Sequence, residues 1–190
     1  MIREVALVFC ALAVTGCTTS SSVTTSYYDI SGSNERELDR SIREQGPMSG
    51  HAFAATQMQI LPVNITPVET ATGCKIGSAS FRVKAKLILP RWKDRSNADQ
   101  DLRNGFDNYA DYALIHEKIH VRIGEAAAMA MGEAVNQIPE QENCDDLYIK
   151  VKSTVAKIQR KHVSLQLAFD ASEKKRIDKL LRASAFASSK

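Results

Sequence analysis

Residues 113–130 read ALIHEKIHVRIGEAAAMA, and they contain the motif around which the rest of the chain is organised. They belong to a longer stretch, 99–136, in which apolar residues recur at helical spacing and an Ala-rich end favours a helix. His116 and His120 are four positions apart, so on a helix their imidazoles point in the same direction. We therefore predict a long helix over 99–136 that carries both imidazoles on one face.

The helix face that carries the two histidines is otherwise apolar. Several apolar residues fall on the same stripe as the two histidines, so we expect the site to lie against the core: Tyr109, Ala113, Ile123, Ala127, Ala130 and Ala134. Imidazoles buried in this way need polar partners or a metal.

The sequence from His116 to His120 matches HExxH, the pattern in which two histidines bind zinc and the intervening Glu acts as a base. Zinc on His116 and His120 would polarise a peptide carbonyl, and Glu117 could take a proton from the attacking water. We therefore predict a zinc-dependent peptidase acting on a peptide or protein substrate. The structural alternative is two core histidines beside an exposed Glu117.

Working outward from this helix, the remaining chain predicts an α+β fold. Residues 34–45 have a capping-box start and read as a helix, and 145–182 predict one or two more helices. Residues 52–61 and 80–89 are strand candidates, the second with strict alternation of apolar and basic side chains. We expect one domain over 27–190, with a small antiparallel sheet packed on long helices.

The N-terminus predicts export. Residues 1–16 have the short apolar core of a signal peptide, and Val14-Thr15-Gly16-Cys17 resembles the bacterial lipobox, which implies a lipid on Cys17. Residues 17–26 are rich in Ser and Thr and are expected to form a flexible tether. The protein would then sit in the bacterial cell envelope, anchored to a membrane and facing the periplasm. Cleavage at Ala11-Leu12-Ala13 and simple secretion is the alternative.

Composition narrows the class of protein further. The formal net charge is only +3, too mild to indicate nucleic-acid binding, and no stretch after residue 20 has the length of a membrane-spanning helix. Cys74 and Cys144 remain after the signal peptide and the lipidation site are set aside. In an oxidising compartment they are expected to form a disulfide, although they could instead bind zinc.

At the family level, the chain resembles DUF922, a family described as predicted secreted zinc-dependent proteases. The likeness covers residues 27–170. Its landmarks are Glu37-Leu38 to Gly46-Pro47, Thr56, Cys74, Leu89-Pro90-Arg91-Trp92, the HExxH, Cys144 and Phe169-Asp170. The resemblance implies a zincin-like fold, peptidase activity and pairing of the two cysteines.

The third zinc ligand stays open at this point, because a zincin site needs three protein ligands. Asp170 matches the family's Asp, Glu140 lies at a gluzincin-like separation from His120, and His162 could reach in from the last helix. Glu125 would face away from both imidazoles. Asp170 is preferred.

Two other functions stay open, the first because of a departure from the family. Relatives commonly follow the Asp with a His-Gly pair, which this chain lacks after Asp170. A catalytically inactive metal-binding or structural lipoprotein is therefore one alternative. A hydrolase of peptidoglycan stem peptides, which would use the same chemistry on another substrate, is the second.

Overall fold

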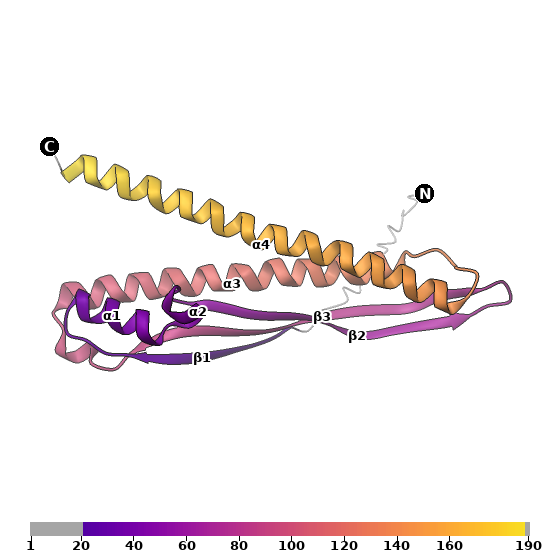
Figure 1. Ribbon diagram of the computed structural model, residues 1–190, viewed down its shortest axis with the longest axis horizontal. Helices are drawn as coiled ribbons and strands as arrows, with labels where there is room; N and C mark the ends of the chain where they lie inside the picture. The colour runs from indigo at the N-terminus through magenta and orange to yellow at the C-terminus, as the bar shows by residue number, and fades with distance from the viewer. Residues whose placement is uncertain (1–20, 189–190) are drawn as a thin grey trace, which may run out of the picture.

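The computed structural model describes residues 21–188, which form a three-stranded sheet covered by long helices. The predicted signal peptide, 1–16, and the lipidation site, Cys17, lie outside the described residues. Three layers follow one another: the sheet, then α3 (Gln100–Asn136), then α4 (Cys144–Ser188) (Figure 1). The α+β class is therefore confirmed. Within the described part of the chain, no helix is both long and apolar enough to cross a membrane.

The sheet is mixed and not wholly antiparallel as expected. Its order is β1-β3-β2, with β2 (Ala55–Glu69) antiparallel to β3 (Cys74–Trp92) and β1 (Ser22–Ile30) parallel to β3. A parallel pair needs a long connection. The chain between β1 and β3 supplies it with α1 (Glu35–Gln45), the short α2 (Pro47–Gly50) and all of β2.

Two predicted boundaries change. Residues 22–26, assigned to the tether, belong to β1, because their backbone pairs with residues 84–88 of β3 and not with solvent. The β2–β3 hairpin extends well beyond the predicted 52–61 and 80–89. Pro62 and Pro67 lie next to register shifts in β2, an edge strand, where a residue without an N–H is tolerated.

The core lies between the sheet and α3. Alternate residues of β3 are buried under the helix: Phe81, Val83, Ala85, Leu87 and Leu89. Met131 and Val135 of α3 and Leu147 of α4 complete the same cluster. A second, smaller cluster around Trp92 joins β1, β3 and α1. The expected disulfide between Cys74 and Cys144 is confirmed, and it ties the start of β3 to the start of α4.

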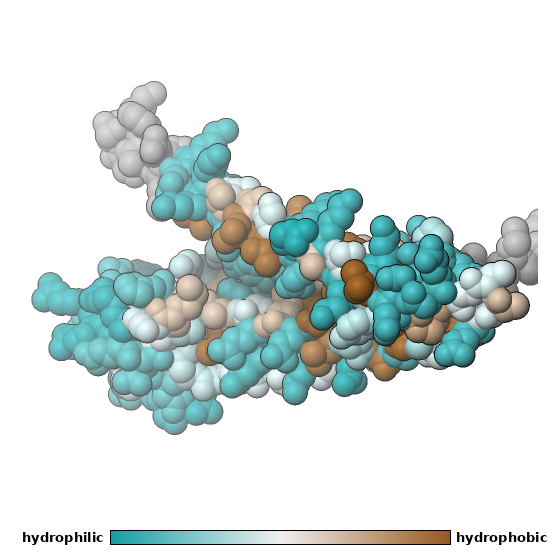
Figure 2. All heavy atoms as spheres, turned by 45° about the vertical axis from the view of Figure 1, so that its right-hand side comes forward, coloured by the Kyte–Doolittle hydropathy of each residue, from teal (hydrophilic) through white to brown (hydrophobic). Residues whose placement is uncertain are grey.

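Helix α4 departs from the body toward its C-terminal end (Figure 1). Its apolar residues Val163, Leu165 and Leu167 are 47–64% exposed. Figure 2 shows α4 rising away from the body, with apolar side chains gathered where it departs. The partly buried positions of this segment, Gln166, Phe169 and Glu173, recur at helical spacing, so α4 contacts its neighbour along one narrow stripe.

Two glycines of α3 provide a matched test of its packing on the sheet. A Cβ at Gly124 would lie 2.1 Å from Sδ of Met58 on β2, whereas Gly105 has nothing within 4 Å. Gly105→Ala is expected to stabilise the protein by about 0.5–1 kcal/mol through helix propensity. Gly124→Ala should gain less than Gly105→Ala, because the end of the Met58 side chain has to move aside for the new Cβ. Urea unfolding measures both, and equal stabilisation would contradict this contact.

Candidate metal centre

Helix α3 carries the HExxH residues, but their side chains pack against two different elements, the sheet and α4. Glu117 lies on the buried stripe that faces the sheet, together with Val121 and Gly124. His116 and His120 are offset from that stripe and face α4, their ring centroids 4.8 Å apart and each about 5 Å from the Phe169 ring. Both imidazoles are largely buried, as expected, but they pack against α4 and not against the sheet. Helix α3 is covered on two sides, and the helical offset between neighbouring residues puts Glu117 toward the sheet.

Helix α4 adds Asp170 to the two imidazoles. Nε2 of His116 and Nε2 of His120 are 3.1 Å apart, and Oδ1 of Asp170 lies 3.2 Å from the first and 2.9 Å from the second. The His side chains are 20% and 14% exposed and the Asp170 side chain 52% exposed. Three donor atoms thus converge at the wall of a cleft, with one side open to solvent.

This triangle fits a tetrahedral metal ion. Ligand atoms about 2.0–2.1 Å from a tetrahedral zinc are about 3.3 Å from one another, close to the three distances found here. The chemistry also fits, because two imidazoles and a carboxylate are ordinary zinc ligands. Nε2 of His120 and Oδ1 of Asp170 are 2.9 Å apart, a separation at which two lone pairs would repel without a proton or a cation between them.

Glu117 lies beside the triangle with few partners of its own. It is 6% exposed, and its Oε2 accepts a hydrogen bond of 2.7 Å from the Thr56 hydroxyl on β2. Among the described residues it forms no ion pair. A buried carboxylate without a countercharge is unfavourable, and a cation on the neighbouring imidazoles would offset that cost. The alternative with an exposed Glu117 does not hold.

The other candidate ligands lie elsewhere or serve another role. Glu140 accepts hydrogen bonds from Thr70 and Thr72 at the β2–β3 turn, where these hydroxyls lower the pKa of its carboxyl group. Glu125 accepts from Ser21. His162 is buried near the site but contacts Gln166 and not the triangle. Of the three third-ligand candidates, the structure places Asp170 with the two imidazoles.

A polar cluster that the sequence analysis missed links α3 to α4 one turn beyond Asp170. The Tyr112 hydroxyl donates to Oε2 of Glu173 at 2.7 Å, and Arg176 donates to both carboxylate oxygens at 3.0 and 2.8 Å. The Arg176 hydrogen bond, followed by that of Tyr112, lowers the pKa of Glu173 to about 2. Burial and the Glu173 hydrogen bond raise the pKa of Tyr112. The sequence did offer a signal for this cluster, because helical spacing puts Tyr112 on the same face as His116 and Glu173 on the same face as Asp170.

Because the pKa of Glu173 is low, the contribution of its carboxylate to the stability of the fold depends on pH. The folded-state pKa of about 2 lies below the ordinary 4.5, so the contribution is complete above pH 4.5 and is lost as pH falls toward 2. The difference in unfolding free energy between wild type and Glu173→Gln is therefore expected to shrink over this range. Denaturant unfolding at a series of pH values measures it, with exposed Glu133→Gln as the control. A difference that stays constant with pH would contradict the assignment.

Two clefts open onto the candidate site. One, of about 430 Å³, is lined by Thr56 and Met58 as well as the HExxH side chains. The other, of about 320 Å³, is lined by Phe53, Tyr109 and Tyr112. His116, Glu117 and Asp170 line both, so the candidate ligands lie between them.

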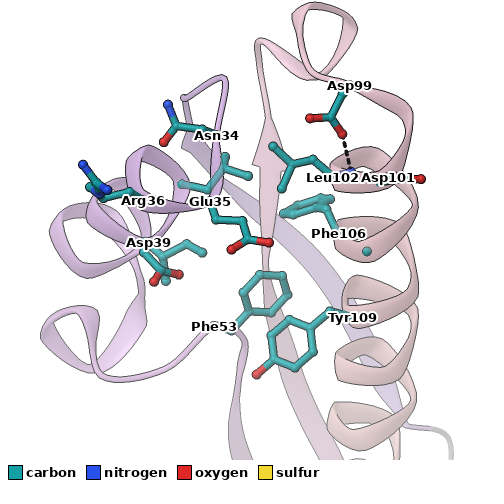
Figure 3. A pocket seen from close by; sticks show the side chains of 13 residues that line it. Asn34, Glu35, Arg36, Asp39, Phe53, Asp99, Asp101, Leu102, Phe106 and Tyr109 are labelled. Carbon is teal, nitrogen blue, oxygen red and sulfur yellow. Dashed lines mark hydrogen bonds between the residues drawn. The ribbon is translucent and has the colours of Figure 1, made fainter. Parts of the chain in front are cut away.

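A larger cavity of about 1090 Å³ adjoins the second cleft and shares Phe53 and Tyr109 with it. The rings of Phe106, Phe53 and Tyr109 form one wall, and the Glu35 carboxylate on α1 faces them (Figure 3). Together the cavities make a long depression that starts at the His–His–Asp triangle and runs toward the N-terminal end of α3.

Fold and site together define a class of protein: a single α+β domain in which an HExxH helix lies against an Asp from a second helix. Residues 25–176 match the family model described as bacterial protein of unknown function (DUF922), and the chain belongs to that family. No curated protein and no solved structure matches the chain.

Proposed function

We propose that the protein is a zinc-dependent peptidase whose metal ligands are His116, His120 and Asp170. The observation that carries the proposal is the triangle of Nε2, Nε2 and Oδ1 atoms at 2.9–3.2 Å, with the Glu117 carboxylate beside it. Zinc bound there would act as a Lewis acid toward a peptide carbonyl and would lower the pKa of water that it binds.

Each side chain then has a role that follows from its position. His116 and His120 lie on one rigid helix, and Asp170 closes the triangle from α4. Glu117 takes the proton of the water that attacks the carbonyl carbon and passes it to the amine nitrogen as the C–N bond breaks. The Thr56 hydroxyl holds the Glu117 carboxylate in place from the sheet side.

The surroundings support a polypeptide substrate over a small molecule. β2 is an edge strand of the sheet, and its Ala55 and Thr56 line the same cleft as Glu117. An extended peptide can add to such an edge through main-chain hydrogen bonds. The depression continues past Phe53 and Tyr109, which leaves room for residues on the far side of the scissile bond.

The proposal is tested first by zinc content. Elemental analysis of protein purified without chelators should give one zinc per chain, and none in a His116→Ala, His120→Ala double variant. Asp170→Ala should weaken zinc binding by a factor of about 100 or more, since each protein ligand carries a share of the 10–16 kcal/mol typical of structural zinc. Wild-type protein that binds no zinc when it is supplied would end the peptidase proposal.

Turnover then separates the peptidase from its rivals. Hydrolysis of a mixed peptide library by the zinc-loaded protein supports the general activity. Cleavage confined to peptidoglycan stem peptides would redirect the substrate assignment. Zinc binding with no cleavage of either would favour an inactive metal-binding protein. We also propose that lipid on Cys17 holds the domain in the bacterial envelope, and mass spectrometry of the membrane fraction should detect the modified Cys.

A further inference from the structure

We propose that Gln166 and His162 on α4 are positioning residues that fix which ring nitrogen of His120 carries the proton and so leave Nε2 free for the metal. The mention of a metal rests on the proposed function. The protonation pattern itself follows from hydrogen-bond geometry in the metal-free protein, so it can be tested separately.

The orientation of the Gln166 amide follows from the backbone of α3. Its Nε2 lies 3.1 Å from the carbonyl oxygen of His120. A carbonyl oxygen can only accept a hydrogen bond, so the amide atom that faces it must be the nitrogen and not the oxygen. Oε1 of Gln166 is then the atom that contacts Nδ1 of His120.

This orientation assigns the proton of His120. The amide oxygen has no hydrogen to donate, so Nδ1 of His120 must be the donor. In a neutral imidazole the lone pair is then on Nε2. That is the atom 3.1 Å from Nε2 of His116 and 2.9 Å from Oδ1 of Asp170. Metal-binding histidines commonly donate their other N–H to such a partner, which sets both ring orientation and tautomer.

His162 holds the amide in this orientation from the other side. The amide nitrogen of Gln166 lies 2.8 Å from Nε2 of His162, so its second hydrogen is donated there and that nitrogen must accept. His162 is 8% exposed, and burial lowers its pKa, with a smaller effect of His120. A neutral His162 with its proton on Nδ1 supplies the required acceptor. Nδ1 of His162 is buried and has no hydrogen-bond partner among the described residues, which is unfavourable.

The wild-type protein provides the first test. The chain has four histidines, so a long-range ¹H–¹⁵N spectrum of the ¹⁵N-histidine-labelled full chain, recorded with chelator near neutral pH, contains few imidazoles. Loss of one set of signals in His120→Ala assigns that residue. We expect His120 to show a protonated Nδ1 and an unprotonated Nε2. The opposite tautomer would overturn the proposal, whatever any variant does.

Three variants test the effect on metal binding. Gln166→Met removes the hydrogen bonds at similar length and is expected to weaken zinc binding about 10–100-fold, with His120 no longer held in one tautomer. Gln166→Glu keeps an acceptor for Nδ1–H but loses both amide donations, so it should retain the tautomer and lose less zinc affinity than Gln166→Met. Gln159→Met, at an exposed position on the same helix, should change neither.

The outcomes separate this inference from the proposed function. Unchanged tautomer and unchanged zinc affinity in Gln166→Met would overturn the positioning role while leaving the zinc site intact. A wild-type chain with the expected tautomer but no zinc binding would instead refute the zinc peptidase. Chelator-competition titration gives the affinities, and thermal unfolding of each metal-free variant checks that it folds. If Gln166→Met does not fold, the wild-type spectrum and Gln166→Glu decide.

Discussion

Glu117→Gln is expected to lower kcat/KM for peptide hydrolysis by about 10²–10⁴-fold, the range that general-base catalysis supplies. Zinc content should stay at that of wild type, because the three proposed ligands are untouched. The amide introduced at position 117 can still accept a hydrogen bond from the Thr56 hydroxyl through its oxygen, so the fold should tolerate the change. Initial rates on a peptide substrate, measured with equal zinc occupancy, give the ratio.

The control for this variant is Glu133→Gln, an exposed carboxylate on the same helix, which should retain full activity. Full activity of Glu117→Gln would rule out Glu117 as the base. Equal loss of zinc and of activity would mean instead that the buried carboxylate helps to hold the metal.

Removing the disulfide with Cys74→Ser and Cys144→Ser is expected to lower the unfolding free energy by about 4 kcal/mol. The two residues are 70 positions apart, so the bond restricts a long loop in the unfolded chain. Such a loss is a large fraction of the stability of an ordinary domain and should lower Tm by about 10 °C. Differential scanning calorimetry measures the shift.

Reduced wild-type protein is the matched comparison, and it should unfold at the same temperature as the double variant. Cys74 is 1% exposed and its backbone pairs with Gln141, so the local structure around the bond is expected to persist when the cross-link is absent. Zinc binding should be unaffected, because the proposed ligands lie on the middle of α3 and α4. Identical Tm values for oxidised wild type and the double variant would contradict a formed disulfide.

The local features of the site could be predicted from neighbouring residues. The 99–136 helix and its HExxH depend on i to i+4 spacing, which residues close in sequence specify. The alternation along 80–89 likewise identified a strand and its buried face, since period-two patterning follows from strand geometry. Cys74 and Cys144 were predicted to pair because few alternatives remained.

The features that were missed all depend on contacts between distant segments. The parallel pairing of β1 with β3 joins residues about 60 positions apart in the sequence, and Ser and Thr composition alone suggested a tether. Which face of α3 packs on the sheet and which on α4 could not be predicted either, because it depends on the positions of both elements. Gln166 and Glu173 are ordinary polar residues on a helix, and nothing in their local sequence indicates a role.

By itself, the sequence determined the α+β class, the long helix that carries His116, Glu117 and His120, and the candidate disulfide, because each follows from local spacing or residue type. Only the tertiary structure decided that Asp170, and not Glu140 or His162, completes the triangle of donor atoms. The reason is physical: the position of Asp170 depends on how α4 packs along α3. That packing is set by side chains more than 50 residues apart in the sequence, including Tyr112, Phe169 and Glu173.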